Sequence, residues 1–261
     1  MFEQKSLKDL ARLFRLLKRV DNGLARLRET MHIYIKQRGE LIVSEEGNLH
    51  VSFLFLFLFG LKYKLNCNPQ TFVESVLLLR ETFQEIVDKA FDDDKYFQRS
   101  LNEAFEYFIN LDTRAAQYLS LFTDSLLRRH SVSSKMQDSQ IQKKLDDVML
   151  VLKYLKDKDI FEEFYKQHLA QRLLHGNGNS EFHEKLMIGK LKFTSKLEGM
   201  FKDIEQSRSL TEQWNLFAKQ FPVSSDPIVE LDAKVLTTGF GFILFFFFMY
   251  YYLCIVQGNT K

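Results

Sequence analysis

Residues 157–174 read Asp-Lys-Asp-Ile-Phe-Glu-Glu-Phe-Tyr-Lys-Gln-His-Leu-Ala-Gln-Arg-Leu-Leu. Apolar side chains recur in this stretch every three or four residues, which is the period of an α-helix that buries one face. Asp159 can cap the start of such a helix, because a side-chain carboxylate accepts hydrogen bonds from the first backbone amides. The stretch therefore predicts a helix that packs against its neighbours. The side chains on or near its buried face are Phe161, Phe164, Tyr165, His168, Leu169 and Leu173.

The residues just before this stretch carry the most regular apolar pattern in the chain. Steps of four and three residues alternate, as in a coiled coil, but the pattern is too short for an independent coiled coil. It predicts a second helix packed against neighbours. A polar, aperiodic segment at residues 128–139 precedes it and predicts a surface connection. The apolar positions of this helix are Ile141, Leu145, Val148, Leu152 and Leu155.

The N-terminal part of the chain also predicts helices. Residues 7–20 have one apolar and one basic face, and Ser6 with Asp9 resembles a capping box. Asp21 can cap the next helix, which should fray near Gly39 because glycine destabilises a helix interior. The apolar positions of that helix are Leu24, Leu27, Met31 and Tyr34.

Two start signals divide the following residues into more helices. Asn68-Pro69 favours a helix start, because proline is tolerated in the first turn. The run Asp92–Asp94 can begin the next helix by capping it. The expected buried positions are Phe72, Val76, Phe83, Val87 and Ala90, then Phe97, Leu101, Phe105 and Phe108, and then Tyr118, Leu119, Phe122 and Leu126.

The C-terminal third continues the helical pattern up to residue 221. A loop at Gly176–Ser180 interrupts it, and a capping box at Ser209 and Glu212 predicts the start of a separate helix. Residues 228–236 alternate apolar and charged side chains, which predicts one half-buried strand. A lone strand cannot form a sheet, so this strand is either an edge or pairs outside this chain.

Two apolar segments have no polar face. Residues 53–59 read Phe-Leu-Phe-Leu-Phe-Leu-Phe and are too short to cross a bilayer. Residues 240–256 are almost wholly apolar and are about the length of a membrane span. A tail-anchored membrane protein is therefore an alternative interpretation, although the aromatic residues are in the middle of the run rather than at its ends.

The composition is that of an ordinary globular chain. Charged residues make up 27% and hydrophobic residues 46% of the 261 residues, and three prolines and 11 glycines leave room for long helices. The formal net charge of +2 is too small to indicate nucleic acid. Cys67 and Cys254 fit neither a disulfide framework nor a zinc site, which favours a reducing compartment. Residues 1–5 lack the apolar core of a signal peptide.

Each candidate for a metal or calcium site has a simpler structural interpretation. His168 and His175 are seven residues apart, whereas metal-binding histidines on a helix more often lie four apart. His183-Glu184 has no second histidine four residues on. The Asp92–Asp94 run lacks the glycine and the final glutamate of a calcium loop, so helix capping is favoured. We expect no metal ligand and no cofactor.

Catalytic and phosphate-binding motifs are absent from the sequence. The Gly176–Asn179 loop lacks a phosphate-loop lysine and follows a helix rather than a strand. There is no Gly-x-Ser-x-Gly motif, and neither cysteine lies in a reactive context. The basic face of residues 5–19 fits a solvated helix face better than a nucleic-acid surface, because its aromatic side chain belongs to the apolar stripe. We therefore expect no catalytic residue, and a scaffold or adaptor rather than an enzyme.

Several ordered motifs resemble those of the cullin family, the elongated scaffolds of multisubunit ubiquitin ligases. Residues 157–174 are similar to a family signature nearly throughout, and Phe193–Asp203 and Val235–Gly239 resemble two later motifs. Residues 105–111 and 118–122 look most like the third cullin paralogue, which pairs with BTB-domain adaptors, and Val43–Gly47 fits the same branch.

The resemblance implies a fold and a division of the chain. We expect an all-α protein in which residues 5–156 form the last cullin-type helical repeat. Residues 157–239 would begin the cullin homology region, with part of a four-helix bundle and the isolated strand at 228–236. The implied function is a non-catalytic scaffold segment of a cullin–RING ubiquitin ligase in ubiquitin-dependent protein degradation, located in the cytoplasm, the nucleus or both.

The same resemblance places the working ends of a cullin outside this sequence. The family binds a substrate adaptor at one end and a RING-box protein at the other, and it carries a lysine modified by a ubiquitin-like protein. No residue here matches either binding end, and no lysine can be assigned that modification. The expected partners are therefore ubiquitin ligase components by resemblance alone, with no nucleic acid and with a membrane reached only through residues 240–256.

Two segments depart from the family pattern. Residues 49–67 are an insertion within a helical repeat, and residues 240–261 replace the family's continuation. Both are rich in Phe, Leu and Tyr, as translated T-rich DNA would be, and Val51-Ser52 can be encoded by a common splice-donor sequence. Our hypothesis is that both are translated intron. Abundant ribosome-loaded mRNA containing these codons would contradict it.

Overall fold

The computed structural model is helical throughout its regular structure, as far as the chain is described. It describes residues 2, 6–43, 68–129, 136–176, 178, 180–191, 194–220 and 234. The all-α prediction is therefore confirmed. The helices are α1 (Leu7–Leu17), α2 (Gly23–Val43), α4 (Pro69–Ala90), α5 (Lys95–Ile109), α6 (Ala115–Leu127), α7 (Asp138–Tyr154), α8 (Lys158–His175), α9 (Glu181–Lys190) and α10 (Thr194–Gln220).

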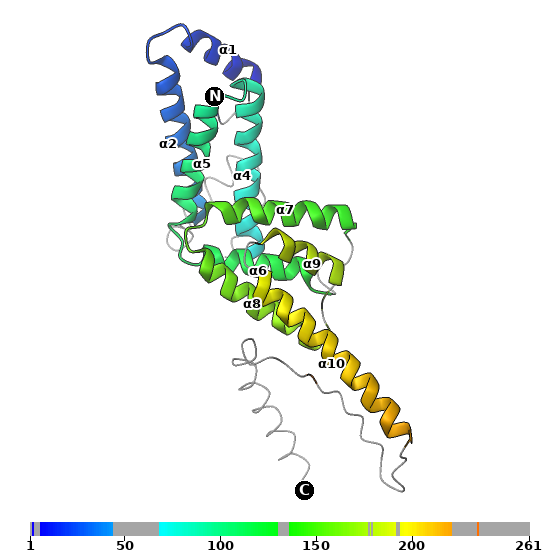
Figure 1. Ribbon diagram of the computed structural model, residues 1–261. Helices are drawn as coiled ribbons and strands as arrows, with labels where there is room; N and C mark the ends of the chain where they lie inside the picture. The colour runs from blue at the N-terminus through cyan, green and yellow to red at the C-terminus, as the bar shows by residue number, and fades with distance from the viewer. Residues whose placement is uncertain are drawn as a thin grey trace. The chain divides into compact units, whose positions relative to one another are not determined.

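The chain divides into two compact units, and α8 runs from one into the other. The first unit holds residues 1–126 and 131–165, and the second holds residues 127–130 and 166–261. In the first unit α2, α4 and α5 lie side by side and α1 lies across their end (Figure 1). The apolar positions predicted for α4, α5 and α7 are all buried in this unit.

A cluster of three phenylalanine rings holds α1 against the turn between α4 and α5. The Phe14 ring stacks on Phe91 with centroids 5.4 Å apart and meets the edge of Phe97 at 5.8 Å. The Phe91 and Phe97 centroids are 4.6 Å apart. All three rings are at most 3% exposed. Because aromatic pairs of this geometry add to the free energy of burial, the cluster fixes the position of α1.

Helices α2 and α5 run parallel in close contact. His32 Nδ1 lies 3.1 Å from the carbonyl oxygen of Ser100, and the Lys36 ammonium lies 3.8 Å from the centre of the Tyr107 ring. These pairs advance in the same direction along both helices. A Cβ atom on Gly39 would lie 2.1 Å from the ring of Phe108, so the absence of a side chain at this position permits the contact.

The caps at the start of α4 and α5 agree with the sequence prediction. The Asn68 side chain accepts a hydrogen bond from the Gln70 amide at 3.2 Å, and proline follows at the first helical position. The Asp94 side chain accepts from the amide of Tyr96 at 2.8 Å. Asp92 and Asp93 have φ angles of 51° and 50°, so they form the left-handed turn that precedes the cap.

A buried arginine joins α4 to α7. The Arg80 Nε donates to the Tyr154 hydroxyl at 2.7 Å, and that hydroxyl donates to Asn102 at 3.1 Å. Asn110 at the end of α5 donates to the Tyr154 carbonyl at 2.8 Å. These bonds satisfy polar groups that would otherwise be buried without partners, so α4, α5 and α7 are held in one arrangement.

The second unit packs the end of α8 with α9 and α10. Ser180 caps α9 by accepting from the Phe182 amide at 3.2 Å. Before α9, Gly176 adopts a φ of 62°, and Gly178 forms an isolated antiparallel bridge with Arg128. The Lys234 ammonium donates to the Leu174 carbonyl in the last turn of α8, where the helix dipole favours a cation.

Three predicted helix boundaries are wrong. Helix α1 ends at Leu17 rather than at residue 20. Helix α2 continues through Gly39 to Val43, because Gly39 is buried in the contact with α5. Helix α10 continues through Ser209 without a break. The Ser207 and Thr211 hydroxyls donate back to carbonyls four residues earlier, at 2.8 and 3.0 Å, so polar residues are accommodated inside this helix.

Three predicted caps are also corrected. Asp21 lies two residues before Gly23, the first residue of α2, and Asn22 between them adopts a φ of 59°. Asp159 lies in the first turn of α8, which begins at Lys158. Ser6 stands at the cap position of α1, but its hydroxyl donates to the Asp9 carboxylate instead of accepting from the backbone.

Parts of several predictions lie outside the described residues. They are the insertion at 49–67, the apolar run at 53–59, the tail at 240–261 and the strand at 228–236 except Lys234.

Candidate interaction surface

The histidine and glutamate candidates lie in α8 and α9 of the second unit. His183 and Glu184 are each 2% exposed. Arg172 of α8 binds the Glu184 carboxylate through two contacts, Nε to Oε1 at 2.5 Å and Nη2 to Oε2 at 2.9 Å. This two-pronged geometry occupies the carboxylate. His175 is exposed at the end of α8, and His168 is half-buried.

Gly178, in the loop considered as a phosphate site, lies beside the Glu184 carboxylate of this ion pair. A Cβ atom on Gly178 would lie 3.7 Å from Oε1 of Glu184. An acidic side chain at this distance disfavours a phosphate group. No group of three or more His, Cys, Asp or Glu side chains suited to a metal ion occurs in the part of the chain that the structure describes. Cys67 and Cys254 lie outside that part.

The basic face of α1 is exposed, as predicted. Lys8, Arg12 and Arg15 of α1 lie at the surface, and so does Arg19 in the turn after it. Arg12 lies 3.5 Å from Asp9, and Arg15 Nε donates to the Ala11 carbonyl at 3.2 Å. These contacts within the helix use part of the basic charge, which fits a solvated face.

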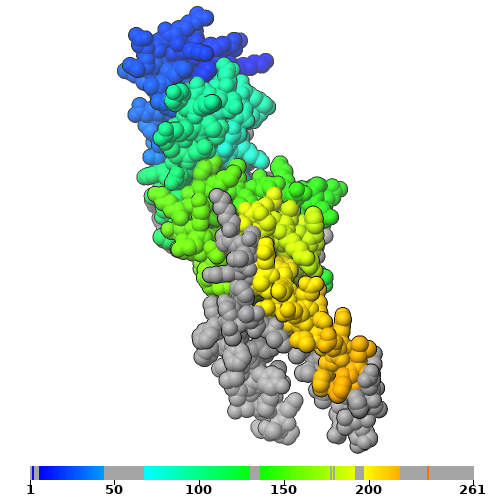
Figure 2. Space-filling model, in the orientation of Figure 1, coloured from blue at the N-terminus to red at the C-terminus, as the bar shows by residue number. Residues whose placement is uncertain are grey.

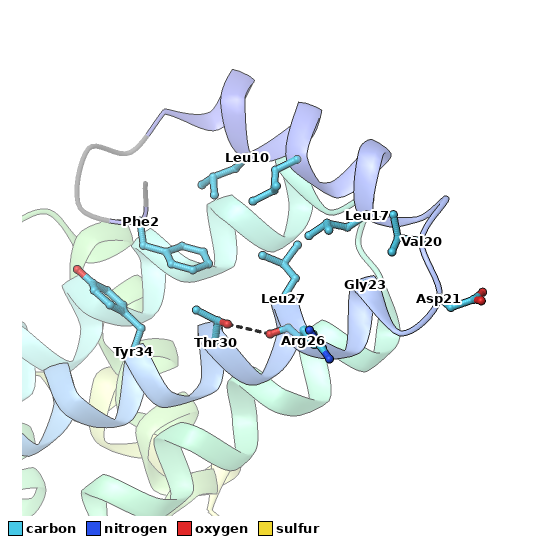
Figure 3. A pocket seen from close by; sticks show the side chains of 11 residues that line it. Phe2, Leu10, Leu17, Val20, Asp21, Gly23, Arg26, Leu27, Thr30 and Tyr34 are labelled. Atoms are coloured by element: carbon cyan, nitrogen blue, oxygen red, sulfur yellow. Dashed lines mark hydrogen bonds between the residues drawn. The ribbon is translucent and has the colours of Figure 1, made fainter.

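A groove lies between α1 and α2 in the first unit, with a cavity volume of about 660 Å³. Figure 3 shows the Phe2 ring directed into it from the segment before α1. The Phe2 ring centroid lies 5.6 Å from that of Tyr34 and 5.9 Å from that of Phe83. The other lining residues are Leu10, Leu13, Leu17, Val20, Asp21, Gly23, Arg26, Leu27 and Thr30.

The side chains that line this groove suit the binding of an apolar group rather than a catalytic reaction. Its polar side chains are Asp21, Arg26 and Thr30, and the Thr30 hydroxyl donates to the Arg26 carbonyl at 2.8 Å. Hydrophobic side chains supply most of the wall. The groove can therefore receive an apolar side chain or a helix face, but it presents no nucleophile beside a base.

The sequence prediction missed this groove and the buried ion pair. The apolar face predicted for residues 7–20 consists of Leu7, Leu10, Phe14 and Leu17, yet Leu13 and Val20 widen the apolar face beyond this single stripe. An apolar face of that width indicates, from the sequence alone, that the helix has a second apolar contact. Arg172 within an apolar run is a comparable signal, because a buried arginine requires a partner.

No helix among the described residues is long and apolar enough to cross a membrane. The run at 240–256, on which the membrane alternative depends, lies outside those residues.

The comparisons with known proteins agree with the motifs. Residues 1–211 match the cullin family over the part described as the cullin alpha solenoid domain. Cullin-3A of Arabidopsis thaliana is 37% identical over 88% of this chain and 29% of its own length. Cullin-3 of Dictyostelium discoideum is 32% identical over 92% of this chain and 29% of its own. Cullin-3 of Caenorhabditis elegans is 32% identical over 92% of this chain and 30% of its own.

The chain therefore spans less than a third of the length of the curated relatives it matches. The match covers the helices from α1 through most of α10, and it includes the signature at residues 157–174. The predicted resemblance is confirmed: this chain belongs to the cullin family.

Proposed function

We propose that this chain is a non-catalytic scaffold segment of a cullin–RING ubiquitin ligase, acting in ubiquitin-dependent protein degradation. The observation that carries the proposal is the α-solenoid match over residues 1–211. The described residues support it, because their buried polar side chains bind one another between helices: Arg80 binds Tyr154, and Arg172 binds Glu184. The cellular location that follows is the cytoplasm, the nucleus or both.

The mechanism is geometric. A scaffold holds a substrate adaptor at a set distance from the ubiquitin-charged enzyme, so its helices must resist bending. Each large side chain that is fully buried contributes roughly 1.5–3 kcal/mol, and Phe97, Phe105 and Phe108 are each at most 1% exposed. The contact of Gly39 with Phe108 and the Arg80–Tyr154 bond fix the directions of α2, α4, α5 and α7.

The division of the chain is part of the proposal. Residues 5–156 act as the last cullin-type repeat, with residues 49–67 as a foreign insert. Residues 157–239 act as the start of the cullin homology region, and residues 240–261 lie outside the family pattern. The segment then supplies the middle of the stalk and holds neither the adaptor site nor the RING-box site.

A pull-down tests the assignment to the middle of the stalk. The purified full chain, immobilised through an N-terminal tag, is incubated with a BTB-domain adaptor and with a RING-box protein at equal concentration. A full-length cullin serves as the positive control. We expect neither protein to be recovered above the level of an empty resin. Stoichiometric recovery of either one refutes the assignment.

A chimera tests the scaffold role itself. Residues 6–239 replace the matching segment of a full-length cullin-3, and ubiquitin transfer to an adaptor-bound substrate is measured. We expect transfer to be retained, because the same helices continue the stalk. The control is the same chimera with Gly39→Leu, which disrupts the α2–α5 contact. Equal loss of transfer in both chimeras contradicts the proposed role.

A further inference from the structure

A row of cations runs along the outer side of α1. Lys8, Arg12, Arg15 and Arg19 follow one another at steps of four and three residues, which places them along one side of a helix. Arg19 lies just past the end of α1, where its amide donates to the Leu16 carbonyl at 3.1 Å and keeps a helical turn. All four cationic side chains are exposed. We call these four residues the basic ridge.

The contacts within α1 leave most of this charge available to a partner. Arg12 and Asp9 lie 3.5 Å apart, but their side chains are 73% and 48% exposed, and an ion pair so well solvated is weak. Arg15 Nε donates to the Ala11 carbonyl at 3.2 Å, which uses one of the five N–H donors of a guanidinium group. The remaining donors can bind the phosphate or carboxylate oxygens of a partner.

The positive charge is concentrated at this end of the first unit. Residues 8–28 hold seven Lys and Arg and two Asp, whereas the whole chain holds 36 Lys and Arg and 34 Asp and Glu. Within the first unit α1 lies across the end of α2, α4 and α5 (Figure 1), and Figure 2 shows these first helices, in blue, at the surface. The outer side of α1 therefore presents a local positive surface although the chain as a whole is nearly neutral.

Exposed aliphatic side chains lie beside the basic ridge. Leu16 is 60% exposed, and Val20 is 59% exposed in the turn that follows α1. Leu16 is turned only about 40° from Arg12 around the helix axis, so the two side chains share one surface. Aliphatic groups gain free energy by leaving water, and cations gain it by meeting anions. This surface therefore suits a partner with an anionic boundary and an apolar interior.

We propose that the basic ridge, with Leu16 and Val20 at its edge, binds the surface of an anionic phospholipid bilayer. The cations pair with the phosphates and carboxylates of the lipid headgroups. The two aliphatic side chains enter the boundary between the headgroups and the acyl chains. The inference does not depend on the scaffold role, and it concerns a different segment from the apolar run at 240–256.

The side chains of this surface favour a bilayer over nucleic acid or an acidic protein. A nucleic acid would pair with the cations but would leave Leu16 and Val20 in water. Single-stranded nucleic acids and protein partners are typically held by exposed aromatic side chains. The one aromatic residue of α1 is Phe14, which is only 3% exposed. Of the three partners, the bilayer matches both the cations and the aliphatic side chains.

Vesicle flotation of the full chain tests the proposal. Phosphatidylcholine vesicles are compared with vesicles of phosphatidylcholine and phosphatidylserine in equal parts, so that binding of residues 240–256 to an uncharged bilayer is measured separately. Binding at low salt should be on the order of tenfold stronger to the vesicles with phosphatidylserine. The excess should fall as salt is raised, because ions screen the attraction. Equal binding to the two kinds of vesicle overturns the proposal.

Two double variants form a matched pair, and circular dichroism checks that both keep their helices. Each ridge cation near an anionic surface contributes about fivefold to the binding constant. Arg12→Glu/Arg15→Glu should therefore lower binding to vesicles with phosphatidylserine by about 25-fold or more. Arg99→Glu/Arg208→Glu makes the same chemical change at exposed arginines of α5 and α10, and it should lower binding less than about threefold. Equal losses in the two variants overturn the proposal.

Two further variants separate charge from fold and lipid from other polyanions. Arg12→Lys/Arg15→Lys keeps the charge and should bind within about twofold of the original chain. Leu16→Ser should weaken binding by about fivefold, because a side chain that enters the bilayer loses its apolar burial. Unchanged binding of Leu16→Ser overturns the proposal. Full competition by a DNA duplex at the same phosphate concentration assigns the ridge to nucleic acid and also overturns it.

Discussion

The surroundings of Asp147 on α7 disfavour the charged form of its carboxylate. It is half-buried, and burial is the main cause that raises its pKa above the ordinary value. The Glu81 carboxylate on α4 raises the pKa further, whereas Lys143 partly offsets the effect. The charged form of Asp147 is therefore less stable in the folded chain than in the unfolded chain.

Replacing this charge should stabilise the first unit at neutral pH. Because the folded-state pKa of Asp147 is raised, the native chain holds its proton more tightly than the unfolded chain does, and the penalty is present above that pKa. Asp147→Asn should raise the free energy of unfolding at pH 7 by about 0.3–0.5 kcal/mol, a small value because solvent screens a half-exposed carboxylate. Urea unfolding followed by circular dichroism measures it.

The pH dependence of this stabilisation tests whether the raised pKa of Asp147 is its cause. The advantage of Asp147→Asn should shrink as the pH falls through the raised pKa, and it should vanish below roughly pH 4, where the carboxyl is protonated in both states. Glu29→Gln, at an exposed site on α2, is the control and should show no such trend. An advantage that grows as the pH falls contradicts the prediction.

The Arg172–Glu184 pair differs from Asp147, because both charges are buried and matched. Arg172→Met should lower the free energy of unfolding by roughly 3–5 kcal/mol, since it leaves the Glu184 carboxylate buried without its guanidinium partner. The double variant Arg172→Met/Glu184→Leu should recover most of this loss. Chemical denaturation of the single and double variants tests the coupling, and additive losses exclude it.

Helix α2 shows how a glycine can belong to a helix core. Its buried residues are spaced four apart and begin and end with glycine: Gly23, Leu27, Met31, Ile35 and Gly39. A Cβ atom on Gly23 would lie 2.4 Å from the Leu17 carbonyl oxygen, and one on Gly39 would overlap the Phe108 ring. Close approach at both ends of α2 therefore depends on the missing side chains.

Gly39→Ala should destabilise the chain although alanine is the better helix former. The added methyl group has no space beside Phe108, and overpacking of this kind costs about 1–3 kcal/mol. Gly189→Ala on α9 is the matched control, because a Cβ atom there meets nothing within 4 Å. It should stabilise by about 0.4–1 kcal/mol. Thermal unfolding of both variants measures the opposite signs, and equal signs contradict the explanation.

The division into two units predicts local rather than global responses. Gly39 lies in the first unit and Arg172 in the second. Hydrogen exchange followed by mass spectrometry should show faster exchange in α2, α4 and α5 for Gly39→Ala, with α9 and α10 unchanged. Arg172→Met should produce the reverse pattern, because separate cores open separately. Faster exchange throughout the chain in both variants indicates one cooperative unit instead.

Much of the fold was predictable from local pattern. The stripes on α4, α5 and α7 and the caps at Asn68 and Asp94 were identified, because each depends on side chains a few residues apart. The end of α2 and the continuity of α10 were not. Gly39 ends a helix by its own preference, and only Phe108, 69 positions later in the sequence, explains why it does not.

The candidate surfaces also separate into features that local sequence predicts and features that depend on contacts between remote segments. The sequence determined the family, the helical class and the expectation of no catalytic or metal residue, since these depend on residue type and spacing along the chain. The tertiary structure decided which apolar faces are covered. The groove beside Phe2, the Arg172–Glu184 pair and the exposure of Trp214 each depend on distances between segments that are remote in sequence. Burial is a property of the folded surroundings, so the apolar pattern at Leu210 and Trp214 resembles that of a core helix, yet both side chains are about half exposed.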